Sequence, residues 1–287
     1  MSDLWPSLAL VLNALVWGLS WWPFRELQAG GLHPLWATCL IYSAITVLIF
    51  VWRPAAARRL ARPSALWVLV LAAGTTNAAF NWAVSIGDVV RVVLLFYLMP
   101  LWAVLLARLL LQERLTWRSG LRVALGLLGA LMVLWPADQA QAHLQNFSLA
   151  DGLGLLGGFS FALNNVMVRR EQHEPESARA AAMFLGGAVV AGALGALLTH
   201  QGQVPAPAWP LPAWPLAAGL AAAFLMANLA LQYGASRLSA HRTAVLMLTE
   251  VLFATTSAWL LGVGWLTPSL IIGGGLILLS ALLAALD

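Results

Sequence analysis

The stretch NAAFNWAVSIGDVVRVVLLFYLMPLWAVLLARLLLQERLT at residues 77–116 decides the fold, because NLALQYGASRLSAHRTAVLMLTEVLFATTSAWLLGVGWLT at residues 228–267 repeats it. Aligned without a gap, the two stretches are identical at twelve of forty positions. Apolar composition alone could match several leucines and alanines. The polar and charged coincidences at this one offset of 151 residues are Asn77/Asn228, Ser85/Ser236, Arg91/Arg242 and Thr116/Thr267. They indicate an internal repeat.

Composition indicates that the repeated segments lie in a membrane. Hydrophobic residues make up 61% of the 287 residues and charged residues only 9%, whereas a soluble domain carries roughly 25% charged residues. Ten apolar runs are long enough to cross a hydrocarbon core of about 30 Å. They lie at about 4–24, 33–52, 64–86, 89–111, 117–135, 149–168, 178–199, 212–234, 240–263 and 268–286. A transmembrane barrel would need short alternating segments instead. We therefore expect an all-α membrane protein with ten transmembrane helices.

The positive charges are distributed unevenly along the chain. All fifteen are arginines, and only Arg25 and Arg91 lie outside the connections after even-numbered runs. The other thirteen are Arg53, Arg58, Arg59, Arg62, Arg108, Arg114, Arg118, Arg122, Arg169, Arg170, Arg179, Arg237 and Arg242. By the positive-inside rule, this bias predicts that those connections and both termini are cytoplasmic. The basic sequence pI of about 10.2 then reflects topology and does not indicate nucleic acid as a partner.

The repeat divides the chain into two five-helix halves, residues 1–145 and residues 146–287. Because five is odd, the second half must cross the membrane in the opposite direction to the first. Two inverted repeats are the architecture of many secondary transporters, whose binding site lies near the midplane between the halves. We therefore expect two inverted five-helix repeats around a central cavity.

Three short stretches resemble a known family. They are NALVWGLSWWPFRE at 13–26, FYLMPLWAVLLARLLLQERLT at 96–116 and LTEVLF at 248–253. They resemble the drug/metabolite transporter superfamily and its EamA-type ten-helix members, and FYLMP after a polar third helix is most similar to the YddG-type amino-acid exporters. Val251 stands where the family usually has proline, and Gly264 where it often has glutamate.

The resemblance implies a basket of ten helices around a cavity lined mainly by the first, third, fourth, sixth, eighth and ninth. It also implies export of small metabolites, commonly amino acids, by alternating access.

Amide side chains recur within the apolar runs. Asn77 and Asn81 lie one helical turn apart, Asn228 and Gln232 have the same spacing at the related positions, and Asn164 lies in the sixth run. Polar groups in lipid need a partner or a water-filled cavity. Either these amides hold helices together, or they line a cavity in which an amide can bind both the ammonium and the carboxylate of a zwitterion.

Three aromatic residues lie mid-helix, where interfacial anchoring is a weak explanation: Trp17, Tyr97 and Trp102. They are either packing contacts or the wall of a cavity that accepts apolar side chains and an ammonium group.

Pro100 lies inside the fourth run and removes one backbone hydrogen bond, which frees the carbonyl of Phe96. Membrane helices tolerate such kinks. The kink is either static or a gating hinge.

Glu250 is a carboxylate in an otherwise uncharged stretch, with Arg242 the nearest charge upstream and Asp287 the nearest downstream. Its partner in the repeat, Met99, is uncharged. One interpretation is a hydrogen bond to a neighbouring helix. The other is contact with a substrate ammonium group or coupling to protons.

These features lead to three hypotheses. The first is an inner-membrane exporter of neutral or aromatic amino acids, and the second is a multidrug exporter for lipophilic cations coupled to protons through Glu250. The third is a membrane enzyme or lipid flippase, for which the sequence offers no catalytic or head-group cluster. We expect no cofactor, since GLGLLG at 152–157 lies in an apolar helix with no preceding strand. We expect no metal, since the five histidines lie near loops and lack the spacing of metal ligands. The expected partners are the substrate and the lipid bilayer, and the expected state is a monomer.

Overall fold

The computed structural model describes residues 3–86, 89–113, 116–134, 147–208, 214–262 and 268–285. Within these ranges the chain forms helices and turns and contains no strand, so the all-helical prediction is confirmed there. The helices are α1 (Leu4–Leu19), α2 (Trp21–Ala29), α3 (Pro34–Trp52), α4 (Pro54–Leu60), α5 (Leu66–Ile86), α6 (Val89–Phe96), α7 (Met99–Leu106), the π-helix η1 (Ala107–Leu111), α8 (Trp117–Leu134), α9 (Leu149–Arg170), α10 (Glu176–His200), α11 (Trp214–Ala235), α12 (Ala240–Met247), α13 (Thr249–Leu260) and α14 (Pro268–Ala285).

Several helices are long and apolar enough to cross a membrane. Within the described ranges they are Leu4–Ala29, Pro34–Trp52, Glu176–His200, Trp214–Ala235 and Ala240–Leu260, with shorter apolar helices at Met99–Leu111 and Ile271–Leu283. These lengths and compositions support the membrane class. The number of ten crossings and the repeat stay predictions.

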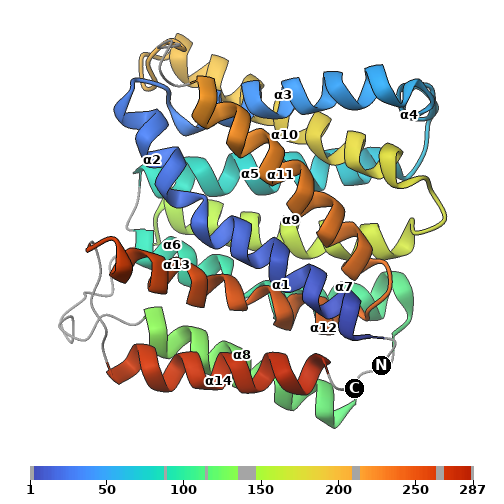
Figure 1. Cartoon of the computed structure of the whole chain (residues 1–287), viewed down its shortest axis with the longest axis vertical. Coiled ribbons are helices and arrows are strands. Elements are labelled where there is room, and N and C mark those ends of the chain that lie inside the picture. The colour runs from blue at the N-terminus through green and yellow to red at the C-terminus, as the bar shows by residue number, and fades with distance from the viewer. Residues whose placement is uncertain are drawn as a thin grey trace.

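The long helices lie side by side, from α3 and α10 at one edge of Figure 1 to α8 and α14 at the other. The start of α1, the end of α14, α4 and α12 lie on the same side of the bundle, at the right of the figure. Helices α2 and α6, which carry Arg25 and Arg91, lie on the opposite side. The arginine-rich α4 and the two ends of the chain therefore share one face.

Helix neighbours are often far apart in sequence. Helix α1 packs against α11 and α13, whereas α9 packs against α5 and α7. Helix α10 lies against α3 and α5, and α8 pairs with α14. The two expected halves are thus interleaved, because each contributes a helix that packs on the other.

Two glycines bring α5 and α10 into close contact. A Cβ atom at Gly186 would clash with the carbonyl oxygen of Val70, and one at Gly74 would clash with the carbonyl oxygen of Gly186. Small residues of this kind let membrane helices approach until their backbones touch. The α5–α10 contact therefore depends on glycine at both positions.

We predict that Gly186→Ala destabilises the protein, because the added methyl group must push α5 and α10 apart. Overpacking of this kind costs about 1–3 kcal/mol, and the measurement is the melting temperature of the purified protein in detergent. The control is Gly219→Ala on α11, where a Cβ atom meets nothing within 4 Å. An unchanged melting temperature for Gly186→Ala would show that the helices tolerate a wider spacing.

Candidate functional site

Two helical stretches are interrupted. The two interruptions are 151 residues apart to within one residue, which is the offset between the two repeats. Helix α6 ends at Phe96 and α7 begins at Met99, while Leu248 separates α12 from α13. In the first case Pro100 lies in the first turn of α7 and has no N–H to donate. In the second case no proline is present, and the N–H of Leu248 donates to the carbonyl of Val245, three residues back, in a tightened turn.

Tyr97 and Glu250 meet at these two interruptions. Tyr97 lies in the turn between α6 and α7 and is 6% exposed, and Glu250 lies in the first turn of α13. Their side chains share a hydrogen bond, in which the phenol donates to the carboxylate. A helix N-terminus stabilises a nearby negative charge, so the first turn of α13 is a favourable place for a carboxylate. This contact joins one predicted half to the other.

Helix α1 covers the segment that carries Glu250. A Cβ atom at Gly18 would lie 2.8 Å from the carbonyl oxygen of Glu250 and 2.7 Å from Cβ of Phe253, so the approach requires glycine. One turn further, Trp21 Nε1 donates to Ser257 Oγ at 3.0 Å. The first helix therefore packs directly on the backbone around Glu250.

Helix α9 makes a comparable approach to the other interruption. A Cβ atom at Gly158 would clash with the carbonyl oxygen of Phe96, the group that Pro100 cannot satisfy within the helix. Gly154 approaches the carbonyl oxygen of Val92, from which a Cβ atom would lie 3.0 Å. The glycines in and beside GLGLLG are thus a packing surface for α6.

The amides of α5 both bind α3. Tyr42 Oη donates to Asn77 Oδ1 at 3.2 Å, and Asn77 Nδ2 donates to the carbonyl of Ala73 at 2.8 Å. Asn81 Nδ2 donates to Thr38 Oγ1 at 2.8 Å. Both amides therefore hold two helices together. Their role in binding substrate stays a prediction.

The amides of α11 and α9 are only partly satisfied by protein groups. Gln232 Nε2 donates to Asn228 Oδ1 at 2.7 Å, and Asn228 Nδ2 contacts Met183 Sδ at 3.2 Å. Asn164 Nδ2 donates to Asn165 Oδ1 at 3.3 Å. The buried oxygens Gln232 Oε1 and Asn164 Oδ1 have no hydrogen-bond partner among the described residues. Buried polar atoms of this kind point to a site for water or a polar ligand.

Trp17 belongs to an aromatic cluster that links α1, α11 and α3. Its ring stacks on that of Phe224, with centroids 4.7 Å apart and an interplanar angle of 25°. The Phe224 ring also contacts the edge of Tyr42, at 5.8 Å between centroids. Since Tyr42 binds Asn77, the cluster connects two of the candidates predicted from the sequence.

Trp102 lies on α7 and packs against α9. Its ring meets Phe159 edge to face at 5.7 Å, and its buried Nε1 has no hydrogen-bond partner among the described residues.

Taken over all the predicted candidates, the structure joins two pairs by direct hydrogen bonds: Tyr97 with Glu250, and Asn228 with Gln232.

Sequence reasoning missed Tyr42 and Phe224. Tyr42 is one of three tyrosines and lies near the middle of the run at 33–52, away from the ends where interfacial anchors belong. That position was the available signal. Phe224 carries no comparable signal, because apolar runs contain aromatic residues everywhere.

A second cluster surrounds Glu113, which follows η1. Its Oε1 lies 2.8 Å from Arg169 Nε at the end of α9. Its Oε2 accepts from the backbone N–H of Ala240 at 3.3 Å, at the start of α12, and lies 3.8 Å from His241 Nδ1. One carboxylate thus connects three segments. The offset places Gly264 at the related position, which lies outside the described residues.

The pKa of Glu113 follows from this environment. Burial raises the pKa of this carboxyl. The opposing effect is larger in sum, since the pKa is lowered by the hydrogen bond with His241, by the charges of Arg169 and His241 and by the Ala240 N–H. The net pKa lies below its ordinary value, so Glu113 is charged at neutral pH. The cluster is therefore an ion pair under ordinary conditions.

Two more ion pairs tie separate segments together. Arg59 on α4 binds Glu174 in a bidentate manner: its Nε donates to Oε2 at 2.7 Å, and its Nη2 donates to Oε1. The hydrogen bond with Arg59 holds the pKa of Glu174 below its usual value. Arg242 Nη1 lies 2.9 Å from Asp3 Oδ2.

One group has the composition of a metal site. Ligand atoms of Glu171, His173 and Glu174 lie within 4.8 Å of one another. Glu174 is already bound by Arg59, and Glu171 faces Arg170 at 3.6 Å. Both carboxylates thus have arginine partners, which compete with a cation.

Comparison with known proteins gives a family and a fold. The sequence model of the EamA-like transporter family matches residues 4–135 and 148–286. A solved structure, described only as the crystal structure of a protein, superposes with a TM-score of 0.81 at 20% sequence identity and covers 98% of this chain and 96% of that one. At that identity the likeness concerns the fold alone. The search of curated proteins returned no match.

We predict that Glu113→Gln lowers the melting temperature at pH 7, because it leaves Arg169 without its carboxylate. A hydrogen bond to a charged group is worth about 2 kcal/mol. Since the folded pKa of Glu113 is lowered, its contribution is present above the ordinary pKa and lost as the pH falls through the folded value. The melting temperatures of variant and parent should therefore converge on acidification.

The control is Glu26→Gln, an exposed carboxylate on α2. It should change the melting temperature little at any pH of the series. A difference between Glu113→Gln and its parent that does not shrink at all as the pH is lowered from 7 to well below the ordinary pKa of a glutamate would contradict the ion-pair explanation.

Proposed function

Because the chain belongs to the EamA-like transporter family, we propose that it exports neutral and aromatic amino acids across the bacterial inner membrane by alternating access. Membership makes it a membrane transporter of small molecules. The substrate class, the direction and the mechanism are our proposal. The observation that carries it is the contact between Tyr97 and Glu250, made where two interrupted helices meet.

The chemistry around this contact suits an amino acid. The Glu250 carboxylate can accept hydrogen bonds from an ammonium group, and the phenol of Tyr97 can turn from the carboxylate to a substrate oxygen. The unpartnered oxygens of Gln232 and Asn164 are further acceptors. The rings of Trp17 and Phe224 supply apolar surface for a side chain, as in most small-molecule sites.

Alternating access is supported by the packing. If residues 1–145 and 146–287 are inverted repeats, α1 and α9 are equivalent, and so are α5 with α11 and α7 with α13. Contacts of α1 with α11 and α13 are then the counterparts of those of α9 with α5 and α7. Interrupted helices at related positions are typical of transporter sites. In this proposal the face that carries α4 and both chain ends is cytoplasmic.

A second candidate is a proton-coupled exporter of lipophilic cations. Among the described residues, Glu250 shares a side-chain hydrogen bond with the neutral phenol of Tyr97. A carboxyl group with a neutral partner is not committed to an ion pair, so it can bind a cation or exchange a proton. Pro100 would act as the hinge in either mechanism.

We predict that the purified protein in liposomes loaded with unlabelled phenylalanine accumulates labelled phenylalanine by counterflow. Glu250→Gln should lower the rate at least about tenfold, because an amide lacks the charge that attracts an ammonium group, and a loss of about 1.4 kcal/mol already gives that factor. Tyr97→Phe should lower it less, because the carboxylate remains. Glu26→Gln serves as the control.

Two results would decide against the amino-acid proposal. One is no accumulation of any common amino acid by protein that is folded in the liposomes. The other is efflux of cationic dyes that follows a proton gradient and is lost in Glu250→Gln. The second result would establish the rival function.

A further inference from the structure

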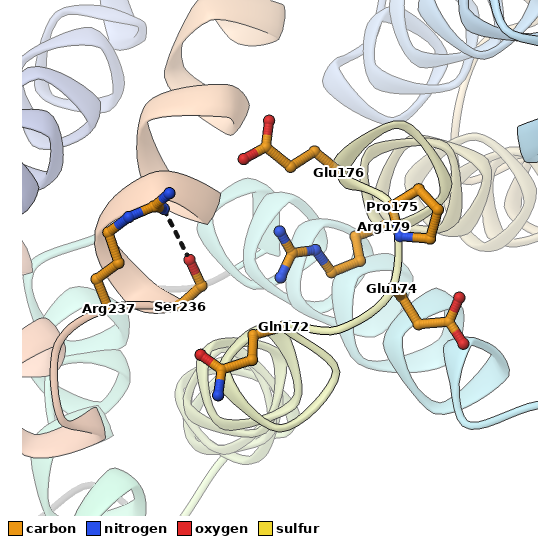
Figure 2. A pocket seen from close by; sticks show the side chains of 7 residues that line it. All are labelled: Gln172, Glu174, Pro175, Glu176, Arg179, Ser236 and Arg237. Atoms are coloured by element: carbon orange, nitrogen blue, oxygen red, sulfur yellow. Dashed lines mark hydrogen bonds between the residues drawn. The ribbon is translucent and has the colours of Figure 1, made fainter.

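A cavity of about 450 Å³ lies away from Glu250, between the turn that joins α9 to α10 and the turn that joins α11 to α12 (Figure 2). Its lining is mainly polar and includes Arg179, Arg237, Gln172 and Ser236. Helices α9 and α11 end at this point, and α10 and α12 begin there. The cavity thus opens at the arginine-rich face, where the helices leave the membrane in our assignment.

Arg179 is the central group of this cavity. It is 2% exposed, and Figure 2 shows its guanidinium directed toward the space between Arg237 and Gln172. Nη1 donates to the carbonyl of Val168 at 3.2 Å, and the buried Nε has no partner. Among the described residues, no carboxylate forms an ion pair with it. A buried charge is costly unless it is paired, so this guanidinium is suited to an external anion.

The carboxylates of the lining leave the cavity positive. Glu174 points away from Arg179 in Figure 2 and is bound by Arg59. Glu176, at the start of α10, is exposed and is the remaining negative group. Two arginines therefore face one uncommitted carboxylate.

Arg237 is held at the rim of the cavity. Its Nη1 donates to the carbonyl of Tyr233 at 3.0 Å and to Ser236 Oγ at 3.2 Å. Its guanidinium lies 3.9 Å over the ring of Tyr233, a cation–π contact. These bonds leave several N–H groups of Arg237 for a ligand.

The first turn of α10 adds to the positive potential. This helix has 25 residues, and its N-cap Pro175 provides no side-chain hydrogen bond. The N–H of Ala178 already donates to the carbonyl of Pro175. The N–H groups of Glu176 and Ser177, the first two of the helix, have no carbonyl partner four residues back within it, and such groups attract anions. Together with the buried Arg179, they make the cavity suitable for an anion with several oxygens.

We propose that this cavity binds a phosphate group, supplied by the headgroup of an anionic phospholipid. Arginine and phosphate match in charge and geometry. A basic pocket between transmembrane helices at the cytoplasmic side is where anionic headgroups bind. The volume accommodates a headgroup, and Tyr233, which Arg237 contacts, is a residue type that favours the membrane interface.

The test is native mass spectrometry of the purified protein with phosphatidylglycerol and, separately, with phosphatidylcholine. We expect preferential retention of phosphatidylglycerol. Arg179→Gln and Arg237→Gln should each weaken it about fivefold, the contribution of one arginine near an anionic lipid surface. The control, Arg58→Gln, removes the same charge from an exposed position on α4 and should change retention little.

If Arg179→Gln does not fold, Arg237→Gln combined with Ser236→Ala decides the question. Adding inorganic phosphate at about 10 mM distinguishes the free ion from the lipid headgroup as the source of the phosphate group. This concentration is roughly in the millimolar range in which weak ligands bind. Competition by phosphate would identify the free ion as a ligand, whereas unchanged retention supports the lipid. Equal retention of the two lipids, or variants that bind like the parent without any effect of phosphate, would overturn the proposal. None of these readouts depends on transport.

Discussion

Polar groups inside a lipid bilayer must find their partners within the protein, and the structure depends on this constraint. Asn77 binds Tyr42, Asn81 binds Thr38, and Glu250 binds Tyr97. Tyr42 and Thr38 lie on another helix, and Tyr97 lies in the turn between α6 and α7, so each bond fixes a contact between segments as well as a side chain. In the proposed function, a polar substrate binds the unpartnered oxygens of Gln232 and Asn164 or replaces some of these bonds. Groups that hold the bundle together are then also groups that recognise the ligand.

The sequence predicts part of this arrangement. Glu250 and Pro100 stand out because a charge and a missing N–H are costly in an apolar helix, and the interruption before Pro100 follows from that chemistry. The interruption at Leu248 has no such signal, since Val251 can donate normally. Helical spacing predicts which face Asn77 occupies, but it cannot identify the opposing helix. Tyr42 as its partner emerges only when α3 and α5 are placed together.

The arginines show the same limit. Their bias toward one set of connections predicts a side of the membrane, because it depends only on counting charges. The carboxylate that each arginine binds cannot be predicted in this way. Arg59 and Glu174 are 115 residues apart, and Arg169 meets Glu113 from the other predicted half. Spacing along the chain contains no information about such pairs. Arg179 is the exception that draws attention, because it is buried without a carboxylate partner among the described residues.

Two of the carboxylates without a counterpart in the repeat, Glu250 and Glu113, act on the same pair of segments. Tyr97 links the α6–α7 interruption to Glu250 at the start of α13, and Glu113, after η1, binds the start of α12. The α6–η1 segment is thus tied to the α12–α13 segment at its middle and at its end. Opening the bundle at the Glu113 end requires breaking an ion pair, and the residue that the offset relates to Glu113 is a glycine, which cannot form one. If the halves are inverted repeats, opening at the two ends in the proposed cycle therefore differs in free energy, and the residues responsible are those that differ between the repeats.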